Sequence, residues 1–289
     1  MKIVISGATG LLGSELAEHF SKCDEVFSLK GSKDINILDF SSITETIVRI
    51  KPHLIIHAAA MRDLDICEEN PEQTYLVNTL GTRNLLNAAR KAKSIFAYIS
   101  SNSVFDGKKE NAYTEFDEVN PINVYGKSKL KSEEEVKASG IPCFILRVPY
   151  LYGIDGHPDR NYILKIVKAL KTNMPMILAC DQKDNPTYVK DLAFMIEKVI
   201  KSDAYGLYHL GNKGTASRYE FAVEIAKTLG LQYENILIPK TIQDMKRMAP
   251  RPANTTLSTL VYETIFDKNI RNWKEALHEC LEKVDEKTL

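Results

Sequence analysis

Three glycines, each three residues after the last, follow a short apolar strand at the start of the chain. The strand is predicted over Lys2–Ser6, the glycines are Gly7, Gly10 and Gly13, and a helix is predicted over Ser14–Phe20. Gly7 allows a tight turn, Gly10 lets the backbone approach a pyrophosphate, and Gly13 permits close packing of helix on strand. The amino end of the helix offers N–H groups and positive potential to an anion. The pattern predicts the dinucleotide-binding unit of an α/β sheet; the alternative is a tight turn that binds no ligand.

The first half of the chain alternates short apolar strands with amphipathic helices, which predicts a Rossmann-type, doubly wound parallel sheet of the α/β class. The strands are expected at Lys2–Ser6, Glu25–Leu29, Leu54–Ala58, Ile95–Ser100 and Cys143–Val148, with helices beginning near Gly10, Ser42, Glu72 and Tyr125. Because right-handed crossovers bring the carboxyl ends of parallel strands to one edge, the segments after the strands should meet there. These segments are residues 6–13, 58–65, 100–107 and 147–153.

After about residue 150 the alternation loosens. Helices are expected at Asn161–Thr172, Val189–Lys201, Ser217–Leu229 and about Trp273–Val284, strands at Pro175–Ala179 and Gly206–Leu210, and a polar, turn-like segment at Asp184–Thr187. Ser217 should cap its helix and form a capping box with Glu220. We predict an NAD(P)-binding domain over residues 1–150, joined by about 178–210, and a smaller α/β substrate-binding lobe from 151–177 and 211–289.

Tyr125 and Lys129 stand four residues apart on a predicted helix and therefore share one face. A tyrosine has a pKa of about 10, and a nearby ammonium together with a positive nicotinamide ring would lower it. Ser101, at the end of a predicted strand, would bind and orient a substrate carbonyl oxygen. The three residues predict transfer of a hydride to a ketone carbon and of a proton from Tyr125 to its oxygen. The alternative is a buried tyrosine beside a surface lysine.

Cofactor choice is read at the end of the second strand, where NAD sites usually place a carboxylate. Lys30 stands there instead and favours NADPH over NADH, unless it is only a solvated charge. The pair Asp39 and Phe40 lies where adenine could be contacted, and the small run Ala58–Ala60 lets a cofactor cross the third strand's end, unless it reflects only close packing. Arg251 fits a diphosphate or a structural role in its own loop.

Composition narrows the class of protein further. The 38 Lys and Arg balance the 38 Asp and Glu, so no net field favours nucleic acid or an anionic membrane. The five cysteines have no Cys-x-x-Cys spacing, which favours free thiols over disulfides, zinc or a catalytic cysteine. The longest apolar stretches, such as Leu54–Met61, are shorter than the about 20 residues of a membrane helix, and the first strand leaves no room for a signal peptide. We expect a cytoplasmic protein without a metal site.

Several motifs resemble the extended short-chain dehydrogenase/reductases, and among them the dTDP-4-dehydrorhamnose reductases. They are Gly7–Gly13, Asp39-Phe40, His57–Ala60 with Asp65 and Glu68, Val77-Asn78, Ile99–Gly107, Pro121–Lys129, Arg147–Gly153, Asn185–Ala193 and Arg251–Leu257. The resemblance implies NAD(P)H-dependent reduction of the C4 ketone of a dTDP-4-dehydro-6-deoxy sugar, giving dTDP-L-rhamnose for cell-surface polysaccharide. It places the catalytic residues at Ser101, Tyr125 and Lys129.

The resemblance also assigns binding residues. Together with the patterns above, it puts the cofactor on Gly7, Thr9, Gly10, Leu11, Leu12, Gly13, Lys30, Asp39, Phe40, Ala58, Ala59, Ala60, Tyr125 and Lys129. The nucleotide sugar is expected at Ser101, Asn102, Tyr150 and Arg251. Whether the chain forms a homodimer is left open.

This chain departs from the family pattern on the substrate side. The family's Ser-Thr-Asp-Tyr is Ser100-Ser101-Asn102-Ser103 here, Val148-Pro149-Tyr150 replaces Thr-Ser-Trp, and Thr256 stands where an arginine is common. These changes leave the redox residues intact and put the exact sugar in question. Two rivals stay open: a nucleotide-sugar epimerase or dehydratase, and a non-catalytic regulatory subunit resembling the β subunit of methionine adenosyltransferase.

Overall fold

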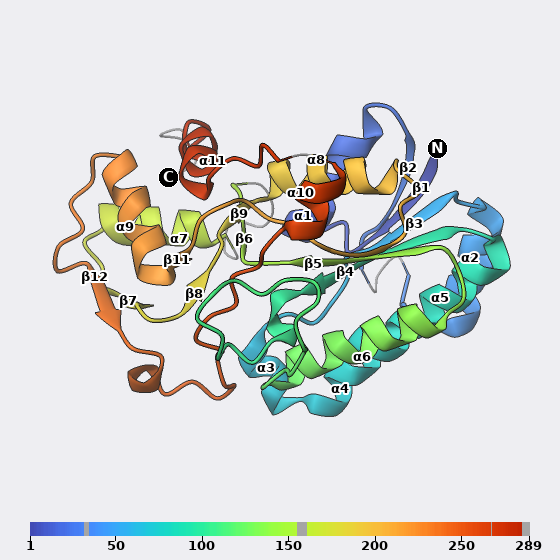
Figure 1. Cartoon of the computed structure of the whole chain (residues 1–289), viewed down its shortest axis with the longest axis horizontal. Coiled ribbons are helices and arrows are strands. Elements are labelled where there is room, and N and C mark those ends of the chain that lie inside the picture. The colour runs from blue at the N-terminus through green and yellow to red at the C-terminus, as the bar shows by residue number, and fades with distance from the viewer. Residues whose placement is uncertain (32–34, 155–160, 267, 285–289) are drawn as a thin grey trace.

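The computed structural model describes residues 1–31, 35–154, 161–266 and 268–284. Its centre is a parallel sheet of six strands in the order β10-β5-β4-β3-β1-β2 (Figure 1). The strands are β1 (Lys2–Ser6), β2 (Glu25–Leu29), β3 (Leu54–His57), β4 (Ile95–Ser101), β5 (Cys143–Val148) and β10 (Gly206–His209). All were predicted to within one residue at either end, and the predicted fold class is confirmed.

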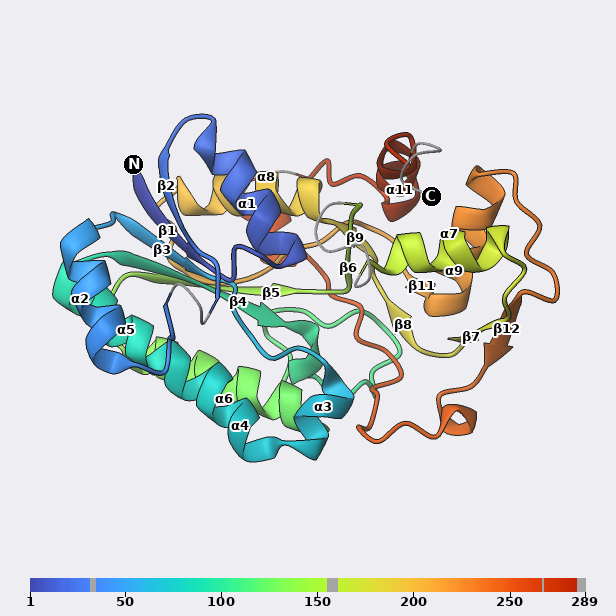
Figure 2. The ribbon, with the colours of Figure 1, turned by 180° about the vertical axis from the view of Figure 1, so that it is seen from behind.

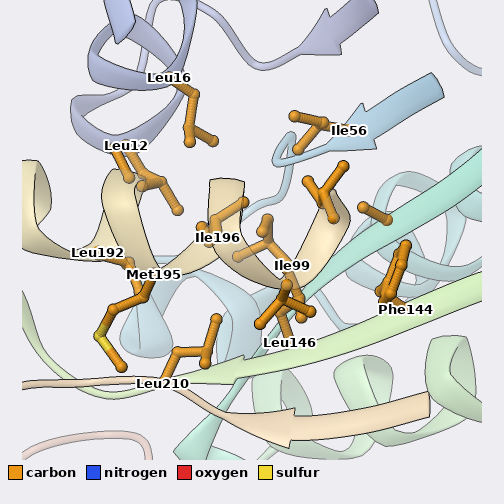
Figure 3. Close-up of a cluster of buried hydrophobic side chains, with 14 of the residues drawn as sticks. Leu12, Leu16, Ile56, Ile99, Phe144, Leu146, Leu192, Met195, Ile196 and Leu210 are labelled. Carbon is orange, nitrogen blue, oxygen red and sulfur yellow. The ribbon is translucent and has the colours of Figure 1, made fainter. Parts of the chain in front are cut away.

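Helices cover both faces of the sheet, as two opposite views show (Figures 1 and 2). One face carries α1 (Leu11–Ser21), α8 (Val189–Ile200) and α10 (Leu260–Ile265), and the other carries α2 (Phe40–Ile50), α5 (Gly81–Ala92) and α6 (Val124–Ala138). On the first face, Leu16, Ile56, Leu146 and Ile196 interdigitate in one buried cluster (Figure 3). Central strands buried on both sides explain the unbroken apolar run Ile3–Ile5.

The strand order reverses between β1 and β3, which are hydrogen-bonded neighbours. In open α/β sheets ligands bind beyond the carboxyl ends of the strands at such a switch point. The glycine turn follows β1 there, and Ala58–Ala60 follow β3. The two segments pack so closely that a Cβ on Gly7 would lie 2.7 Å from the backbone nitrogen of Ala59. This contact explains the glycine at position 7, whereas the choice between cofactor binding and close packing for the alanine run stays open.

The connection from β3 to β4 holds more structure than the single helix expected near Glu72. It contains α3 (Leu64–Glu69), α4 (Pro71–Tyr75), the π-helical turn η1 (Leu76–Leu80) and α5. Helix α3 has only six residues and was missed, although Asp63 caps it by accepting from the N–H groups of Asp65 and Ile66. Short helices carry too little periodicity for the sequence pattern to reveal them.

A smaller unit forms around a second core at one end of the sheet (Figure 2). Its helices are α7 (Tyr162–Lys171), α9 (Arg218–Thr228) and α11 (Trp273–Leu281), beside the parallel pair β7 (Met176–Ala179) and β12 (Leu237–Lys240) and the short 3-10 helix η4 (Gln243–Met245). The capping box of Ser217 and Glu220 is present, as predicted. Strand β12 was not predicted, because Pro239 interrupts its strand pattern.

Two short strand pairs link the smaller unit to the large sheet. They are β6 (Leu151–Tyr152) with β9 (Thr187–Tyr188), and β8 (Lys183–Asp184) with β11 (Ala216–Ser217). The expectation of a turn-like segment at Asp184–Thr187 was thus wrong at both ends. Asp184 and Thr187 each lie in a short strand, because each pairs with a segment distant in the sequence. Only Asn185 and Pro186 remain between the two strands.

The division at residues 150, 178 and 210 stays a prediction. Helix α8 and strand β10 pack with the large sheet, whereas Leu178 of β7 belongs to the smaller core and Tyr262 of α10 to the larger one. Within the described ranges, no helix has both the length and the apolar character needed to cross a membrane.

Candidate active site

A cavity of about 330 Å³ opens at the carboxyl edge of the sheet, between the large sheet and the smaller unit. Most of the predicted site residues line it: Gly7, Gly10, Leu11, Leu12, Gly13, Ala58, Ala60, Ser101, Asn102, Tyr125, Lys129, Tyr150 and Arg251. They come from segments far apart in the chain, so the fold brings the predicted phosphate turn, hydroxyl pair and lysine to one place.

The glycine turn has the geometry expected of a phosphate-binding loop. Gly7 has a φ of +75°, a conformation that L-residues rarely adopt. A Cβ on Gly13 would overlap the carbonyl oxygen of Gly7, so only glycine allows α1 to start this close to β1. Gly10 precedes α1 without a side-chain cap, and the first turn has no acidic residue. The first N–H groups of α1 are therefore suited to an anionic ligand.

Two alanine substitutions should separate the roles of these glycines. Gly13→Ala forces the overlap with Gly7 and should lower the free energy of unfolding by about 1–3 kcal/mol. At Gly10 a Cβ would lie 3.3 Å from the Gly7 carbonyl oxygen, which is tight but tolerable. Gly10→Ala should instead weaken NADPH binding by about tenfold or more, because the methyl group occupies the phosphate approach. Urea unfolding and fluorescence titration measure the two effects, and equal loss of stability in both variants would contradict this division.

Ser101 and Tyr125 form the centre of the cavity wall. Ser101 ends β4 and caps the 3-10 helix η2 (Asn102–Val104), its Oγ accepting from the N–H of Ser103 at 3.1 Å. Tyr125 lies in the first turn of α6, which Asn123 caps by accepting from the N–H of Gly126. Burial raises the pKa of Tyr125, and a side-chain hydrogen bond with Ser101 acts in the opposite direction.

Lys129 lies one turn further along α6 than Tyr125 and is buried. Its Nζ donates to the carbonyl oxygen of Ile99 at 2.6 Å and lies 4.2 Å from the centre of the Tyr98 ring. Burial lowers the pKa of Lys129 to about 7, against the opposing effect of Glu133. Burial is the main cause of the raised pKa of Tyr125, and the lowering expected from the ammonium together with a positive nicotinamide ring stays a prediction.

A buried ion pair holds α6 against the sheet behind the cavity. Glu133, one turn beyond Lys129, accepts from Nε and Nη2 of Arg147 on β5 at 2.9 and 2.8 Å. It also accepts from the hydroxyl of Ser100 at 2.6 Å. Both charged side chains are almost inaccessible, at 0% and 2% exposure. Both Ser100 and Ser101 line the cavity, and Ser100 also binds α6 through Glu133.

Within the described part of the chain, four arginines line the cavity, and only Arg251 was predicted. The others are Arg62, Arg218 and Arg247. Arg251 donates to Asp65 at 2.9 Å and to the carbonyl oxygen of Ala249 at 3.0 Å. It thus has the structural role considered from sequence and also faces the cavity. Burial and the charge of Arg251 lower the pKa of Arg247. This concentration of positive charge suits an anionic ligand.

Asp184 is a carboxylate in the cavity lining beside Arg218, and it too was missed. It lines the cavity from β8 at 5% exposure. Burial raises its pKa, while Arg218 and a hydrogen bond from Asn102 oppose that shift. No local pattern could have identified Asp184 or the additional arginines, because each is a single charged residue in a loop or at the end of a short element.

The remaining predicted cofactor residues lie outside the cavity lining. They are Thr9, Lys30, Asp39, Phe40 and Ala59. Asp39 caps α2 by accepting from the N–H of Ser42, and Phe40 is exposed with the Lys91 ammonium 5.2 Å from its ring centre. Lys30 is exposed and directly follows Leu29, whose carbonyl oxygen accepts from the N–H of Ala8 in the glycine turn. Their role in binding adenosine stays a prediction.

Among the residues that the structure describes, the histidines and cysteines form neither a metal site nor a disulfide. His57 bonds Ser6 and Thr82 at 2.6 and 3.0 Å, and burial lowers its pKa to about 3. No group of three His, Cys, Asp or Glu side chains in the described ranges is arranged to hold a metal ion. The five cysteines are free thiols.

Known proteins resemble this chain along nearly its whole length. The spore coat polysaccharide biosynthesis protein SpsK of Bacillus subtilis (strain 168) is 32% identical over 97% of each chain. Methionine adenosyltransferase 2 subunit beta of Xenopus tropicalis is 31% identical, over 91% of this chain and 82% of its own.

Solved structures agree with the fold. A dTDP-4-dehydrorhamnose reductase of Clostridium acetobutylicum ATCC 824 superposes with a TM-score of 0.91 at 36% identity, covering 98% of this chain and 99% of its own. The dTDP-4-dehydrorhamnose reductase of Bacillus anthracis str. Ames, solved in complex with NADP, gives a TM-score of 0.92 at 30% identity over the same shares. The family described as RmlD substrate binding domain matches residues 1–286. This chain therefore belongs to the RmlD substrate binding domain family, within the extended short-chain dehydrogenase/reductases.

Proposed function

We propose that this protein is an NADPH-dependent oxidoreductase that reduces the C4 ketone of dTDP-4-dehydrorhamnose to give dTDP-L-rhamnose, a precursor of cell-surface polysaccharide. The observation that carries the proposal is the common cavity of Ser101, Tyr125 and Lys129 with the glycine turn. Two solved structures that share the fold at 30% identity or more are dTDP-4-dehydrorhamnose reductases, one of them in complex with NADP.

The residues of the turn fit a dinucleotide. The N–H groups of Leu11 and Leu12 would hold the pyrophosphate, and Gly10 leaves space for it. Lys129 would hold the nicotinamide ribose, since its ammonium lies at the cavity wall. Bound NADPH supplies the hydride for the reduction. Lys30 beyond β2 supports NADPH over NADH, because a cation there favours a 2′-phosphate.

Three side chains would act on the ketone. The Ser101 hydroxyl donates a hydrogen bond to the carbonyl oxygen and orients it. Tyr125 transfers its phenolic proton to that oxygen as negative charge develops there, which its raised pKa suits, because the proton is retained until the oxygen becomes basic. Lys129 then stabilises the phenolate by its charge.

Arg62, Arg247 and Arg251 are proposed to bind the diphosphate of the nucleotide sugar. They approach the same cavity from the loop after β3 and from the segment after η4. A guanidinium offers two parallel donors to phosphate oxygens. Arg251 is already oriented by Asp65, so little conformational entropy would be lost when it binds.

The regulatory-subunit hypothesis is the strongest alternative, because methionine adenosyltransferase subunits match the chain about as closely as the reductases do. The intact Ser101, Tyr125 and Lys129 set favours catalysis. An epimerase or dehydratase is less consistent with the site, because Asn102 and Ser103 offer no acid or base beside the catalytic hydroxyl.

The decisive assay mixes purified protein with NADPH, then with NADH, and dTDP-4-dehydro-6-deoxy-L-lyxo-hexose, and follows nicotinamide absorbance. We expect rapid oxidation with a lower KM for NADPH. Omission of the sugar is the control for background oxidation. Binding of NADPH without its consumption would overturn the reductase proposal and favour the regulatory subunit, which a pull-down with a methionine adenosyltransferase catalytic subunit then tests.

Compartment and assembly belong to the same proposal. Free thiols at all five cysteines support a cytoplasmic location, where reducing conditions keep them unpaired. The homodimer remains a prediction, and sedimentation velocity at micromolar concentration measures it.

A further inference from the structure

The amide of Asn102 is held in one orientation beside the catalytic serine. Its Nδ2 donates to Oδ1 of Asp184 at 2.9 Å and to the carbonyl oxygen of Thr255 at 3.1 Å. Both amide protons are thereby used, so the amide oxygen must face Ser101, whose hydroxyl donates to it at 3.3 Å. Asp184 therefore influences the catalytic hydroxyl through one intervening amide.

The two oxygens of Asp184 have different surroundings. Oδ1 accepts from Asn102 and from the N–H groups of Asn185 and Tyr150, at 2.8 and 3.4 Å for the backbone donors. Oδ2 lies 3.9 Å from Nη2 of Arg218, beyond hydrogen-bond distance. In the part of the chain that the structure describes, Oδ2 has no hydrogen-bond donor. A carboxylate oxygen of a buried side chain that borders a cavity and lacks a donor is suited to accept one from a ligand.

Arg218 occupies a position that is locally unfavourable for a positive charge. It is the first residue of α9, where the helix dipole disfavours a cation. Its guanidinium carbon lies 3.2 Å from the centre of the Tyr150 ring, and the carboxylate of Asp184 is its anionic neighbour. Stacking on the ring fixes the plane of the guanidinium. Asp184, Arg218 and Tyr150 thus form one preorganised wall of the cavity.

We propose, on the basis of the reductase function above, that Asp184 is the sugar-specificity residue of this chain: its Oδ2 accepts a hydrogen bond from the 2- or 3-hydroxyl of the sugar ring, on a wall shared with Arg218 and Tyr150. The chain has Asn102 where the reductases that it resembles have an aspartate. The carboxylate missing at position 102 is thus present across the cavity at position 184, in contact with the same amide.

The contact predicts a substrate-dependent loss in the variant Asp184→Asn. Asparagine keeps the shape of the side chain but has only one carbonyl oxygen. Whether its NH2 group or this neutral oxygen faces the cavity, the charged acceptor is lost. On the parent keto-sugar, kcat/KM should fall about 30-fold, in the range of a lost charge-assisted hydrogen bond. Wild-type protein should lose a similar factor on whichever of the 2-deoxy and 3-deoxy analogues lacks the bound hydroxyl. The variant should lose nothing further on that analogue.

Controls separate this contact from a structural role. Asp181→Asn changes an exposed carboxylate three residues earlier, which accepts from the N–H of Ile242, and should alter none of the ratios. NADPH affinity should be unchanged in both variants. An equal loss for Asp184→Asn on the parent sugar and on both analogues would overturn the proposal and leave Asp184 as a structural acceptor for Asn102.

A second pair of variants covers the case in which Asp184→Asn does not fold. Asn102→Asp places two carboxylates in contact and should lower activity, since two like charges cannot both ionise there. Adding Asp184→Asn to it restores one carboxylate and one amide, and should recover at least tenfold of the lost kcat/KM. If the folded double variant does not recover this activity, the proposal that Asp184 supplies the carboxylate missing at position 102 is contradicted. If wild-type protein consumes no NADPH, the reductase function fails, and calorimetry with the same three sugars still decides the hydroxyl contact.

Discussion

Replacing Tyr125 with Phe is expected to lower kcat about a thousandfold while leaving NADPH binding nearly unchanged. The substitution removes only the phenolic proton, and a positioned general acid contributes about 10²–10⁴ to rate. The ring remains to fill its place in the cavity wall, so the dissociation constant of NADPH should change by less than about threefold. Single-turnover oxidation of NADPH measures the chemical step apart from product release.

Tyr75→Phe supplies the matched control, because Tyr75 ends α4 with 37% of its surface exposed and lies outside the cavity lining. Its kcat should equal that of the wild type. Turnover by Tyr125→Phe within a few-fold of the wild type would remove Tyr125 from the mechanism. Another donor would then be required, and Ser101 is the remaining hydroxyl beside it.

Replacing Glu133 with Gln is expected to lower the free energy of unfolding by about 3–5 kcal/mol. The variant leaves the guanidinium of Arg147 buried without the carboxylate that binds it directly. Glu133 also keeps the pKa of Lys129 from falling further, so the variant should shift the pH dependence of turnover. Urea unfolding followed by circular dichroism gives the stability.

Glu134→Gln is the control for the loss of one charge from α6. Glu134 pairs with Lys131 at the surface, where both side chains are about half exposed, and such pairs contribute about 0–1 kcal/mol. A Glu133→Gln variant no less stable than Glu134→Gln would show that the buried pair is solvated or dispensable. Replacing Glu133 and Arg147 together by apolar residues should recover part of the stability, because no charge is then left unpaired.

The parts of the fold that the sequence reveals are those specified locally. The strands of the sheet stand out because burial on both faces demands short apolar runs, as in Ile3–Ile5. Gly7 and Gly13 are recognisable because no other residue satisfies the turn or the packing of α1. Tyr125 and Lys129 are recognisable because a helix presents residues four apart on one face.

What the sequence does not reveal depends on contacts between distant segments. Asp184 faces the cavity because β8 pairs with β11, and Arg218 faces it because α9 starts directly after that strand. Each looks like an ordinary surface charge in its own neighbourhood. The direction of the pKa shift of Tyr125 is similarly hidden, because it depends on how deeply the assembled cavity buries the phenol.

The π-helical turn between α4 and α5 limits how this site can change. In that turn Asn78 bonds the backbone N–H and carbonyl of Met61, which follows the Ala58–Ala60 run, and its Nδ2 also donates to Ser128 on α6. The backbone carbonyl oxygen of Asn78 accepts from the hydroxyl of Ser132, one turn further along α6. Deleting one residue of Leu76–Leu80 would rotate Asn78 by about 100° and break both sets of bonds at once. One residue therefore holds the segment after β3 and helix α6 together, and a chimera that imports α6 from a relative must import this turn as well.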